Sequence, residues 1–253
     1  MIRDARILVI ETTGRTGSVC VARGRTVLAV AELPSHARHA GGLHETIDRL
    51  VRGQGWRPDA IEEVYVSGGP GSFTGARIGI TTARTLAWCT GAKLVRVPTV
   101  DALARNALRA ESPPAFVAVA LDAKRSQIFA GFFAIRDGGR CEKILDATMA
   151  DPLTFLSDTC PQQAGVSADR IAVLGEGVEY HRQAIEQAGV MVLPRELWPA
   201  RAESVHAVGL AMAEVGLYCA PGDCVPIYVR IPEPEEKWLA REAALRRGSG
   251  PAS

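Results

Sequence analysis

The sequence predicts an α/β protein built from two related lobes. Strand-like segments followed by helical segments occur once before Thr99 and again after it, and this repetition favours two lobes of similar architecture. Apolar residues make up 47% of the 253 residues, which is enough for a packed core. The length fits one large α/β domain or two small lobes. The repeat is architectural, since the two halves share no obvious residue pattern.

The first half starts with three strand-like segments, at residues 7–10, 18–22 and 26–33. Gly24 and Arg25 fit a two-residue hairpin turn between the last two. A helix is predicted next, from apolar residues at helical spacing, namely Leu43, Ile47, Leu50 and Val51. Gly53 and Gly55 mark its end. A buried strand at 64–67, a helix at 75–89 ended by Gly91 and a strand at 93–97 complete this half.

The second half repeats the plan. We expect a helix from Thr99 to about residue 108, then strands at 115–122, 127–135 and near 142–148. The remaining expected elements are a short helix after Asp151, a strand at 171–174, a helix at 178–188, a strand at 191–193 and a helix at 203–217.

Composition excludes several classes of protein. With 29 Lys and Arg against 28 Asp and Glu, the chain lacks the basic excess of a protein that clamps nucleic acid. Apolar runs such as 116–121 are far too short to cross a bilayer, and the N-terminus has no signal-peptide pattern, so we expect a cytoplasmic protein. Six scattered cysteines without a Cys-x-x-Cys pair indicate reduced thiols, and pairing of Cys219 with Cys224 stays open.

The densest signal is the glycine-rich stretch at 67–79, between a predicted strand and a predicted helix. Its backbone N–H groups and the helix dipole suit an anion. Yet Thr74 stands where a dinucleotide fingerprint needs its third glycine, no Gly-Lys-Ser/Thr follows, and neither Ser67 nor Ser72 lies in Gly-x-Ser-x-Gly. These patterns therefore exclude the Rossmann, Walker and α/β-hydrolase motifs.

The helix that follows carries a ridge of small residues at four-residue spacing, formed by Gly75, Gly79, Ala83 and Ala87. The ridge fits either the protein's own sheet or a close-packed helix of another subunit. A neighbouring stripe on the same helix combines charged, polar and aromatic residues, namely Arg77, Thr81, Arg84 and Trp88. This combination favours an exposed surface that faces a partner.

Three other positions are candidates for chemistry. Glu11, followed by Thr12 and Thr13, is either a contact to nucleotide-bound magnesium or a stabiliser of the turn after the first strand. Asp122, followed by Lys124, is either a catalytic carboxylate or part of a salt-bridged turn. The cluster His36, His39 and His44 has poor spacing for a metal on a helix and lacks a completing carboxylate group, so we expect no metal site.

Four blocks spread over most of the chain carry a resemblance. They are Ile7-Leu8-Val9-Ile10-Glu11-Thr12, Gly69-Pro70-Gly71-Ser72-Phe73-Thr74-Gly75-Ala76-Arg77-Ile78-Gly79, Asp122-Ala123-Lys124 and Pro226-Ile227-Tyr228-Val229-Arg230. With these blocks the chain resembles the TsaB family, the bacterial subunit of the tRNA threonylcarbamoyladenosine synthesis complex. The resemblance implies two lobes of the actin, sugar kinase and Hsp70 (ribonuclease H-like) type, with mixed sheets and flanking helices.

The resemblance also implies an organisation and a role. We expect an N-terminal lobe at 1–100 plus 203–231 that holds a dimerisation surface, a C-terminal lobe at 101–202 and a flexible charged tail at 232–253. The implied role is non-catalytic. The chain would pair with a TsaD-type paralogue, the transferase that modifies adenosine beside the anticodon. A TsaE-type ATPase would complete the set, and tRNA would bind through the complex. The same surface could also form a homodimer.

Two departures from the related proteins bear on cofactors. The family usually has Asp where this chain has Glu11, and the longer side chain would displace a metal-phosphate contact, so we expect neither ATP nor magnesium as a cofactor. The transferase uses a His-x-x-x-His metal pair, whereas His39 here is followed by His44. An ATP-dependent enzyme or a metallopeptidase-like protein of the same fold is the alternative.

The implied interface uses helices of the N-terminal lobe. We expect it on the outer faces of the helices at 40–52 and 75–89. Its residues would be His39, Leu43, His44, Gly75, Arg77, Gly79, Thr81, Ala83, Arg84 and Trp88.

Overall fold

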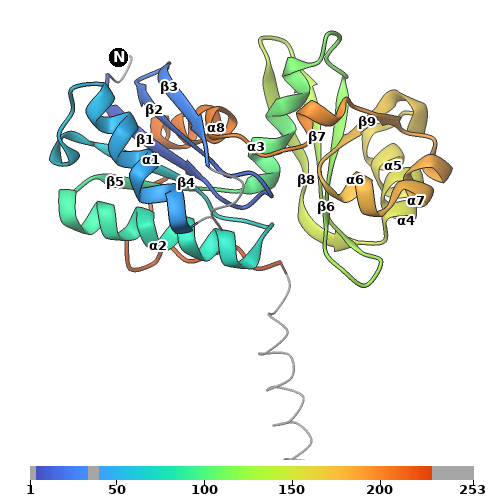
Figure 1. The fold of residues 1–253 in the computed structure, drawn as a ribbon. Helices are drawn as coiled ribbons and strands as arrows, with labels where there is room; N and C mark the ends of the chain where they lie inside the picture. The colour runs from blue at the N-terminus through green and yellow to red at the C-terminus, as the bar shows by residue number, and fades with distance from the viewer. Residues whose placement is uncertain (1–3, 34–39, 230–253) are drawn as a thin grey trace, which may run out of the picture.

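A computed structural model of the chain describes residues 4–33 and 40–229 (Figure 1). The first sheet begins with an antiparallel meander of β1 (Arg6–Glu11), β2 (Ser18–Arg23) and β3 (Thr26–Glu32). Two parallel strands, β4 (Glu63–Ser67) and β5 (Lys93–Val97), extend it on the other side of β1. The resulting order is β3-β2-β1-β4-β5, with β1 at the centre.

The second sheet has the same plan. Its strands are β6 (Phe116–Asp122), β7 (Ile128–Arg136), β8 (Arg140–Ala150), β9 (Ile171–Leu174) and β10 (Met191–Val192). Within the described residues they form a five-stranded sheet of order β10-β9-β6-β7-β8, in which β6, β7 and β8 are antiparallel and β9 and β10 are parallel additions. The duplicated topology confirms the predicted two-lobed fold of the actin, sugar kinase and Hsp70 type.

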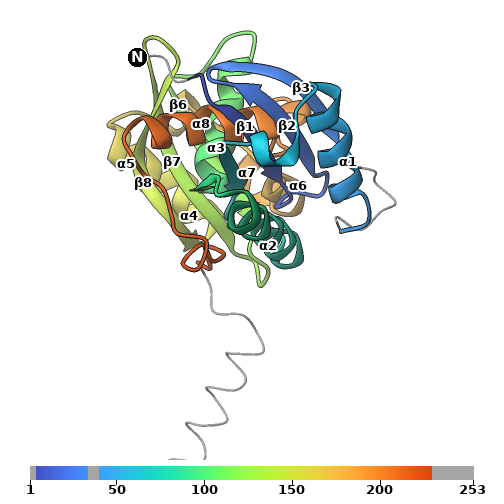
Figure 2. The ribbon, with the colours of Figure 1, turned by 90° about the vertical axis from the view of Figure 1, so that its left-hand side faces the viewer.

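Helices cover both faces of the first sheet (Figure 2). Helices α1 (Ala40–Gly53) and α2 (Phe73–Thr90) share one face, while α8 (Ala202–Glu214) returns from the second lobe to cover the other. Residues 7–10 of β1 are therefore all apolar, because Leu8 and Ile10 pack beneath α1 and α2 whereas Ile7 and Val9 pack beneath α8. Helix α3 (Thr99–Asn106) lies between the lobes and contributes to the cores of both (Figure 1).

Shorter helices complete the second lobe and the connections. The α-helices are α4 (Pro152–Thr154), α5 (Cys160–Ala164), α6 (Gly177–Tyr180) and α7 (Arg182–Ala188), and a π-helical turn at Phe155–Thr159 joins α4 to α5. Turns of 3-10 helix occur at Pro58–Ala60, Ala107–Arg109, Ala168–Arg170 and Arg195–Leu197. Within residues 4–33 and 40–229, no helix is both long enough and apolar enough to cross a bilayer.

The predicted helices differ from the structure in three places. The single helix expected at 178–188 is broken at His181, whose φ of −118° is not helical. The short helix expected after Asp151 continues to Ala164 through a π-helical turn, in which the N–H of Cys160 donates to the carbonyl of Phe155. Helix α8 ends before the predicted residue 217, because Gly216 has a left-handed φ of 80°. The exact limits of the two lobes stay a prediction, and the tail from residue 230 lies outside the described residues.

Candidate functional site: the interlobe cleft and the outer face of α2

The glycine-rich loop after β4 packs on the turn after β1. Ser72 begins helix α2, and its hydroxyl accepts a 3.1 Å hydrogen bond from the backbone N–H of Gly75. The N–H of Ser72 in turn donates to the carbonyl of Thr13 at 2.8 Å. At Gly71 a Cβ would lie 2.6 Å from the same carbonyl oxygen, so the two backbones touch there. The glycines of the loop thus allow close contact within the protein itself.

Glu11 is fully buried at the end of β1 and closes the following turn. Its Oε1 accepts hydrogen bonds from the N–H of Thr13 at 2.5 Å, the hydroxyl of Thr13 at 2.7 Å and the N–H of Gly14 at 3.1 Å. The backbone donors that a phosphate group would use at this turn are therefore already occupied by a carboxylate of the chain. Of the two sequence interpretations, the structure supports the turn stabiliser.

Burial has an electrostatic consequence for Glu11. Desolvation raises the pKa of its carboxyl above the ordinary value, and hydrogen bonds from Ser67, Thr13 and Gly14 oppose this shift without cancelling it. The hydroxyl of Thr13 also lies 3.0 Å from that of Thr99, which accepts a 3.1 Å hydrogen bond from the N–H of Gly69. A buried polar network thus joins the end of β1, the glycine-rich loop and the start of α3.

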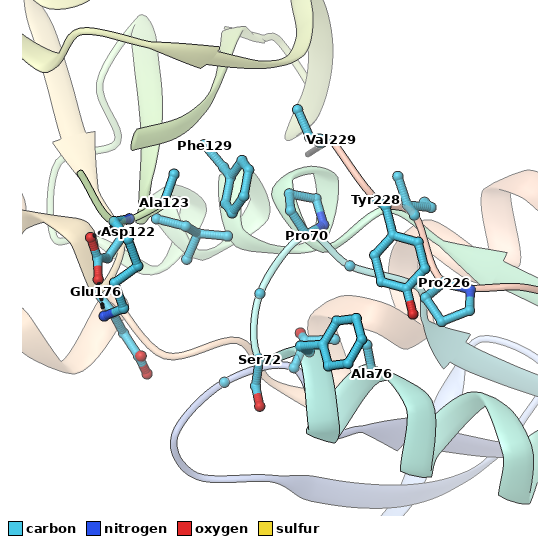
Figure 3. Close-up of a pocket in the computed structure, with 18 of the residues that line it drawn as sticks. Pro70, Ser72, Ala76, Asp122, Ala123, Phe129, Glu176, Pro226, Tyr228 and Val229 are labelled. Atoms are coloured by element: carbon cyan, nitrogen blue, oxygen red, sulfur yellow. Dashed lines mark hydrogen bonds and ion pairs between the residues drawn. The ribbon is translucent and has the colours of Figure 1, made fainter. Parts of the chain in front are cut away.

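A cleft of about 840 Å³ lies between the lobes. Figure 3 shows Asp122, Ala123 and Glu176 on one side of the loop that carries Pro70 and Ser72, with Pro226 and Tyr228 on the other side. Most of the lining is apolar or aromatic, including Phe73, Leu121, Phe129, Tyr180, Ile227 and Val229. Three cationic side chains, those of Arg15, Lys124 and Arg125, also line the cleft, so its walls combine apolar surface with positive charge.

Arg15 links the two lobes across this cleft. Its backbone N–H donates to Glu176 at 3.2 Å, and its guanidinium forms an ion pair with Glu179 at 3.1 Å. The guanidinium also lies 5.2 Å from the centre of the Tyr180 ring. These contacts join the turn after β1 to α6, and they hold the first lobe against the second.

Asp122, at the end of β6, forms part of a salt-bridged turn. It accepts from the N–H of Lys124 at 3.0 Å and from Lys124 Nζ at 2.5 Å, and Nε2 of His181 lies 3.4 Å away. Burial opposes ionisation, but the hydrogen bonds from Lys124 outweigh it and lower the pKa of Asp122. The structure therefore supports the salt-bridged turn rather than the catalytic carboxylate.

The same turn carries three successive residues in the left-handed region. The φ angles of Lys124, Arg125 and Ser126 are 63°, 51° and 59°. Each such residue other than glycine costs free energy, which makes this the most strained backbone segment at the cleft.

The outer face of α2 presents two cation-aromatic groups. At its N-terminal end the guanidinium of Arg77 lies 4.0 Å from the centre of the Phe73 ring and donates a 2.9 Å hydrogen bond to the hydroxyl of Tyr228. Near its C-terminal end Arg84 lies 5.3 Å from the ring centre of Trp88, which is 63% exposed. Thr81 is exposed between them. We call these residues of α2, namely Phe73, Arg77, Thr81, Arg84 and Trp88, the α2 outer face.

Four residues predicted for the interface lie inside the first lobe instead. Leu43 and Ala83 belong to the core beneath α1 and α2, while Gly75 and Gly79 contact Thr12 at the end of β1. The small-residue ridge therefore packs on the protein's own sheet, and its prediction as a surface for another subunit was wrong. The ridge is buried because α2 must approach β1 closely, and small side chains permit this.

Other predicted residues are either exposed or outside the described part. His44 is exposed on α1, whereas His39, together with His36 and the motif residue Arg230, lies outside the described residues. Pro70 follows a cis peptide bond, and Thr74 is exposed in the first turn of α2. Across residues 4–33 and 40–229, the His, Cys, Asp and Glu side chains form no group of three that could hold a metal ion.

The sequence singled out Asp122 and Lys124 in the second lobe, but sequence reasoning missed the other part of that lobe that lines the cleft, namely Glu176 and Tyr180. The signal was the pair Gly175 and Gly177 directly after β9, which occupies the same topological place as the glycine-rich loop after β4. At Gly177 a Cβ would lie 2.8 Å from the carbonyl oxygen of Ala120. Both lobes thus use glycine after the fourth strand to bring a loop against the first strand.

A comparison with models of known protein families shows to which family the chain belongs. The family described as TsaD: tRNA N6-adenosine threonylcarbamoyltransferase matches residues 33–244, most of the chain. The chain belongs to this family. Within it, the chain is 27% identical over 237 residues to the tRNA threonylcarbamoyladenosine biosynthesis protein TsaB of Bacillus subtilis, covering 92% of this chain and 97% of that protein.

Further comparisons place the chain in the TsaB/YeaZ branch of the family. It is 27% identical over 191 residues to the tRNA N6-adenosine threonylcarbamoyltransferase of Anaeromyxobacter dehalogenans, but this match covers 68% of the chain and only 57% of that enzyme. A crystal structure from Pseudomonas aeruginosa, described as an uncharacterized protein with similarity to peptidase YEAZ, superposes with a TM-score of 0.76 at 22% identity, covering 89% of this chain and all of that one. This likeness shows that the TsaB/YeaZ-type fold extends over nearly the whole chain.

Proposed function

We propose that this chain is the non-catalytic dimerisation subunit that binds a TsaD-type transferase and supports it in forming N6-threonylcarbamoyladenosine in tRNA beside the anticodon. The match over nearly the full length of a TsaB protein supports this role, whereas the match to a transferase covers little more than half of that enzyme. In this proposal a TsaE-type ATPase completes the set, tRNA binds through the complex, and the proteins work in the cytoplasm.

The observation that carries the proposal is the α2 outer face. Trp88 exposes 63% of its surface and Phe73 41%, and arginines lie on both rings. Exposed tryptophan and arginine side chains are the residues that contribute most to binding free energy in protein interfaces. A partner that covers this face would bury both rings and keep the cation-aromatic pairs in a drier environment, where they are stronger.

The turn after β1 supports a role without chemistry at this site. Glu11 occupies the backbone donors of Thr13 and Gly14, so a nucleotide phosphate would have to displace a buried carboxylate. In the second lobe Asp122 is held by Lys124. Both lobes therefore use their strand-end carboxylates to hold their own backbone.

The same face offers a homodimer contact. Two copies of the chain would meet through identical surfaces, so the homodimer and the heterodimer would exclude each other. Addition of the paralogue should then convert a homodimer into a heterodimer.

Solution mass is the test. Light scattering on a sizing column would be run on the full chain alone, on the TsaD-type paralogue from the same genome, and on their mixture. We expect a species with the summed mass of one copy of each protein. A mixture that elutes as its two separate components at concentrations well above micromolar would overturn the proposal, and calorimetry with ATP and magnesium would then test the enzyme alternative.

A further inference from the structure

The segment 225–228 is fixed to the first lobe beside the glycine-rich loop. The guanidinium of Arg96 on β5 donates to the carbonyl of Val225 at 2.8 Å, and the N–H of Ile227 donates to the carbonyl of Gly68 at 2.7 Å. A side chain on this segment therefore has a defined position relative to the sheet and to α2.

The side chain of Tyr228 joins this segment to α2. Figure 3 shows Tyr228 beside the turn of α2 that carries Ala76. The ring centre of Tyr228 lies 5.4 Å from that of Phe73, and its hydroxyl accepts a 2.9 Å hydrogen bond from Nε of Arg77. The guanidinium of Arg77 also lies 4.0 Å from the centre of the Phe73 ring. Two aromatic side chains therefore hold Arg77, one on its own helix and one on the segment 225–228.

The guanidinium of Arg77 is prepared to bind a further acceptor. Arginine has five N–H donors, and the hydrogen bond to Tyr228 uses the one at Nε. Within residues 4–33 and 40–229, the donors at its two Nη atoms have no acceptor. These donors match the two oxygens of a carboxylate. Because the side chain is already ordered, a partner would lose less free energy in fixing it.

The surface around Arg77 combines apolar groups with positive charge. Val225 exposes 48% of its surface and Tyr228 42%. Helix α2 contains Arg77 and Arg84 but neither Asp nor Glu in its 18 residues. A partner surface that fits must therefore offer apolar side chains together with a carboxylate.

We propose that the partner surface continues from the α2 outer face onto Val225 and Tyr228, and that Tyr228 positions Arg77 to bind a carboxylate of the partner. The inference rests on the proposed function, in which the partner is the TsaD-type paralogue, and it adds the chemistry that this part of the interface recognises. Apolar side chains of the partner would cover Val225 and the Tyr228 ring. Since Tyr228 also lines the cleft, the interface would reach the edge of the cleft.

Titration calorimetry of the full chain with the TsaD-type paralogue tests the positioning role. Tyr228→Phe removes the hydroxyl and keeps the ring, and we expect the Kd to rise about fivefold. Arg77→Ala should raise the Kd about tenfold. The double variant should bind no more weakly than Arg77→Ala, because the hydroxyl acts through Arg77. Tyr180→Phe is the matched control, since this hydroxyl accepts from Arg15 on the other side of the cleft, and the Kd should stay unchanged.

Salt dependence tests whether Arg77 meets a carboxylate. The Kd of the parent chain should rise between about 50 and about 500 mM sodium chloride, because salt screens exposed charges. The Kd of Arg77→Ala should rise less steeply, since one charge pair is lost. Equal slopes for the two proteins would overturn the assignment of a carboxylate to this position.

Val225→Asp tests whether the partner covers the segment. A charge placed there should raise the Kd about tenfold, because the partner would bury it without a matching cation. Val192→Asp on β10 is the control at a similarly exposed position of the second lobe, where the Kd should stay unchanged. The inference alone is overturned if Trp88→Ala weakens the heterodimer while Tyr228→Phe and Val225→Asp leave the Kd unchanged. Absence of any heterodimer with the parent chain would overturn the proposed function as well.

Discussion

The backbone of α2 rests on Thr12 at Gly75. The Thr12 hydroxyl donates a 2.8 Å hydrogen bond to the carbonyl of Gly75, and the carbonyl oxygen of Thr12 fills the space that a side chain at Gly75 would occupy. One turn further along, Gly79 contacts the Thr12 hydroxyl in the same way. The turn after β1 therefore determines where α2, and with it the α2 outer face, lies on the sheet.

Gly75→Ala is expected to destabilise the first lobe strongly. The new methyl group would overlap a backbone oxygen that cannot move without shifting β1, and overpacking of this kind costs about 3 kcal/mol or more in the free energy of unfolding. Urea unfolding followed by circular dichroism measures the loss. Gly53→Ala is the matched control, because a Cβ there meets nothing within 4 Å, and its midpoint should stay unchanged or rise. Equal midpoints for the two variants would contradict the close packing.

Glu11 predicts how stability depends on pH. Its pKa in the folded protein is raised above the model-peptide value of 4.5, so the folded state binds the proton more tightly than the unfolded state. The free energy of unfolding should therefore fall as the pH rises from about 4.5 through the folded-state pKa.

Glu11→Gln isolates this effect. The amide oxygen can accept the hydrogen bonds from Thr13 and Gly14 without carrying a charge, so the variant should gain stability relative to the parent chain as the pH rises toward neutrality. Urea unfolding of both proteins at a series of pH values measures the difference. A difference that is constant with pH would show that Glu11 ionises as easily in the folded as in the unfolded protein.

Much of the fold could be predicted because local patterns and tertiary packing agree. Residues 7–10 are apolar without alternation since β1 is covered on both faces, and Gly91 ends α2 with a left-handed φ of 76° as its position predicts. The break at His181 was missed because Val178 and Ile185 continue a helical apolar pattern across it. Apolar spacing alone does not reveal a backbone break of this kind.

The candidate site was predictable only in part. Periodicity indicated that Gly75, Gly79 and Ala83 share one face of a helix, but it could not tell the inner face from the outer one. The neighbouring stripe was recognised by its mixed residue types, and the structure exposes Arg77 and Trp88. The cleft depends on contacts between distant segments, such as that of Arg15 with Glu179, and no local pattern contains them.

Ser126→Gly is expected to stabilise the protein by about 1 kcal/mol. Ser126 is exposed and has a φ of 59°, and glycine adopts this conformation without the cost that a Cβ imposes. Thermal and urea unfolding measure the gain. Thr85→Gly is the control in an exposed helical position of α2, where the change to glycine should cost a few tenths of a kcal/mol, because threonine is already a weaker helix former than alanine. A loss of stability at both positions would indicate that the turn at 124–126 is not strained.

Trp88→Ala should weaken the proposed heterodimer while leaving the fold intact. The ring is 63% exposed and packs against Arg84, so its removal leaves no cavity in the core and should change the unfolding free energy by less than about 0.5 kcal/mol. If the ring is an anchor of the interface, its loss costs about 2 kcal/mol of binding, which is roughly a thirtyfold increase in Kd. Titration calorimetry with the TsaD-type paralogue measures Kd.

Val215→Ala provides the control for this titration. Val215 is 73% exposed and follows α8, on the opposite face of the first sheet from α2. Its truncation should leave the Kd unchanged, because a partner on the α2 outer face does not reach it. Arg84→Ala should weaken binding in the same direction as Trp88→Ala, since the guanidinium holds the ring in place. If Val215→Ala weakened binding and Trp88→Ala did not, the partner would dock on the α8 side of the sheet.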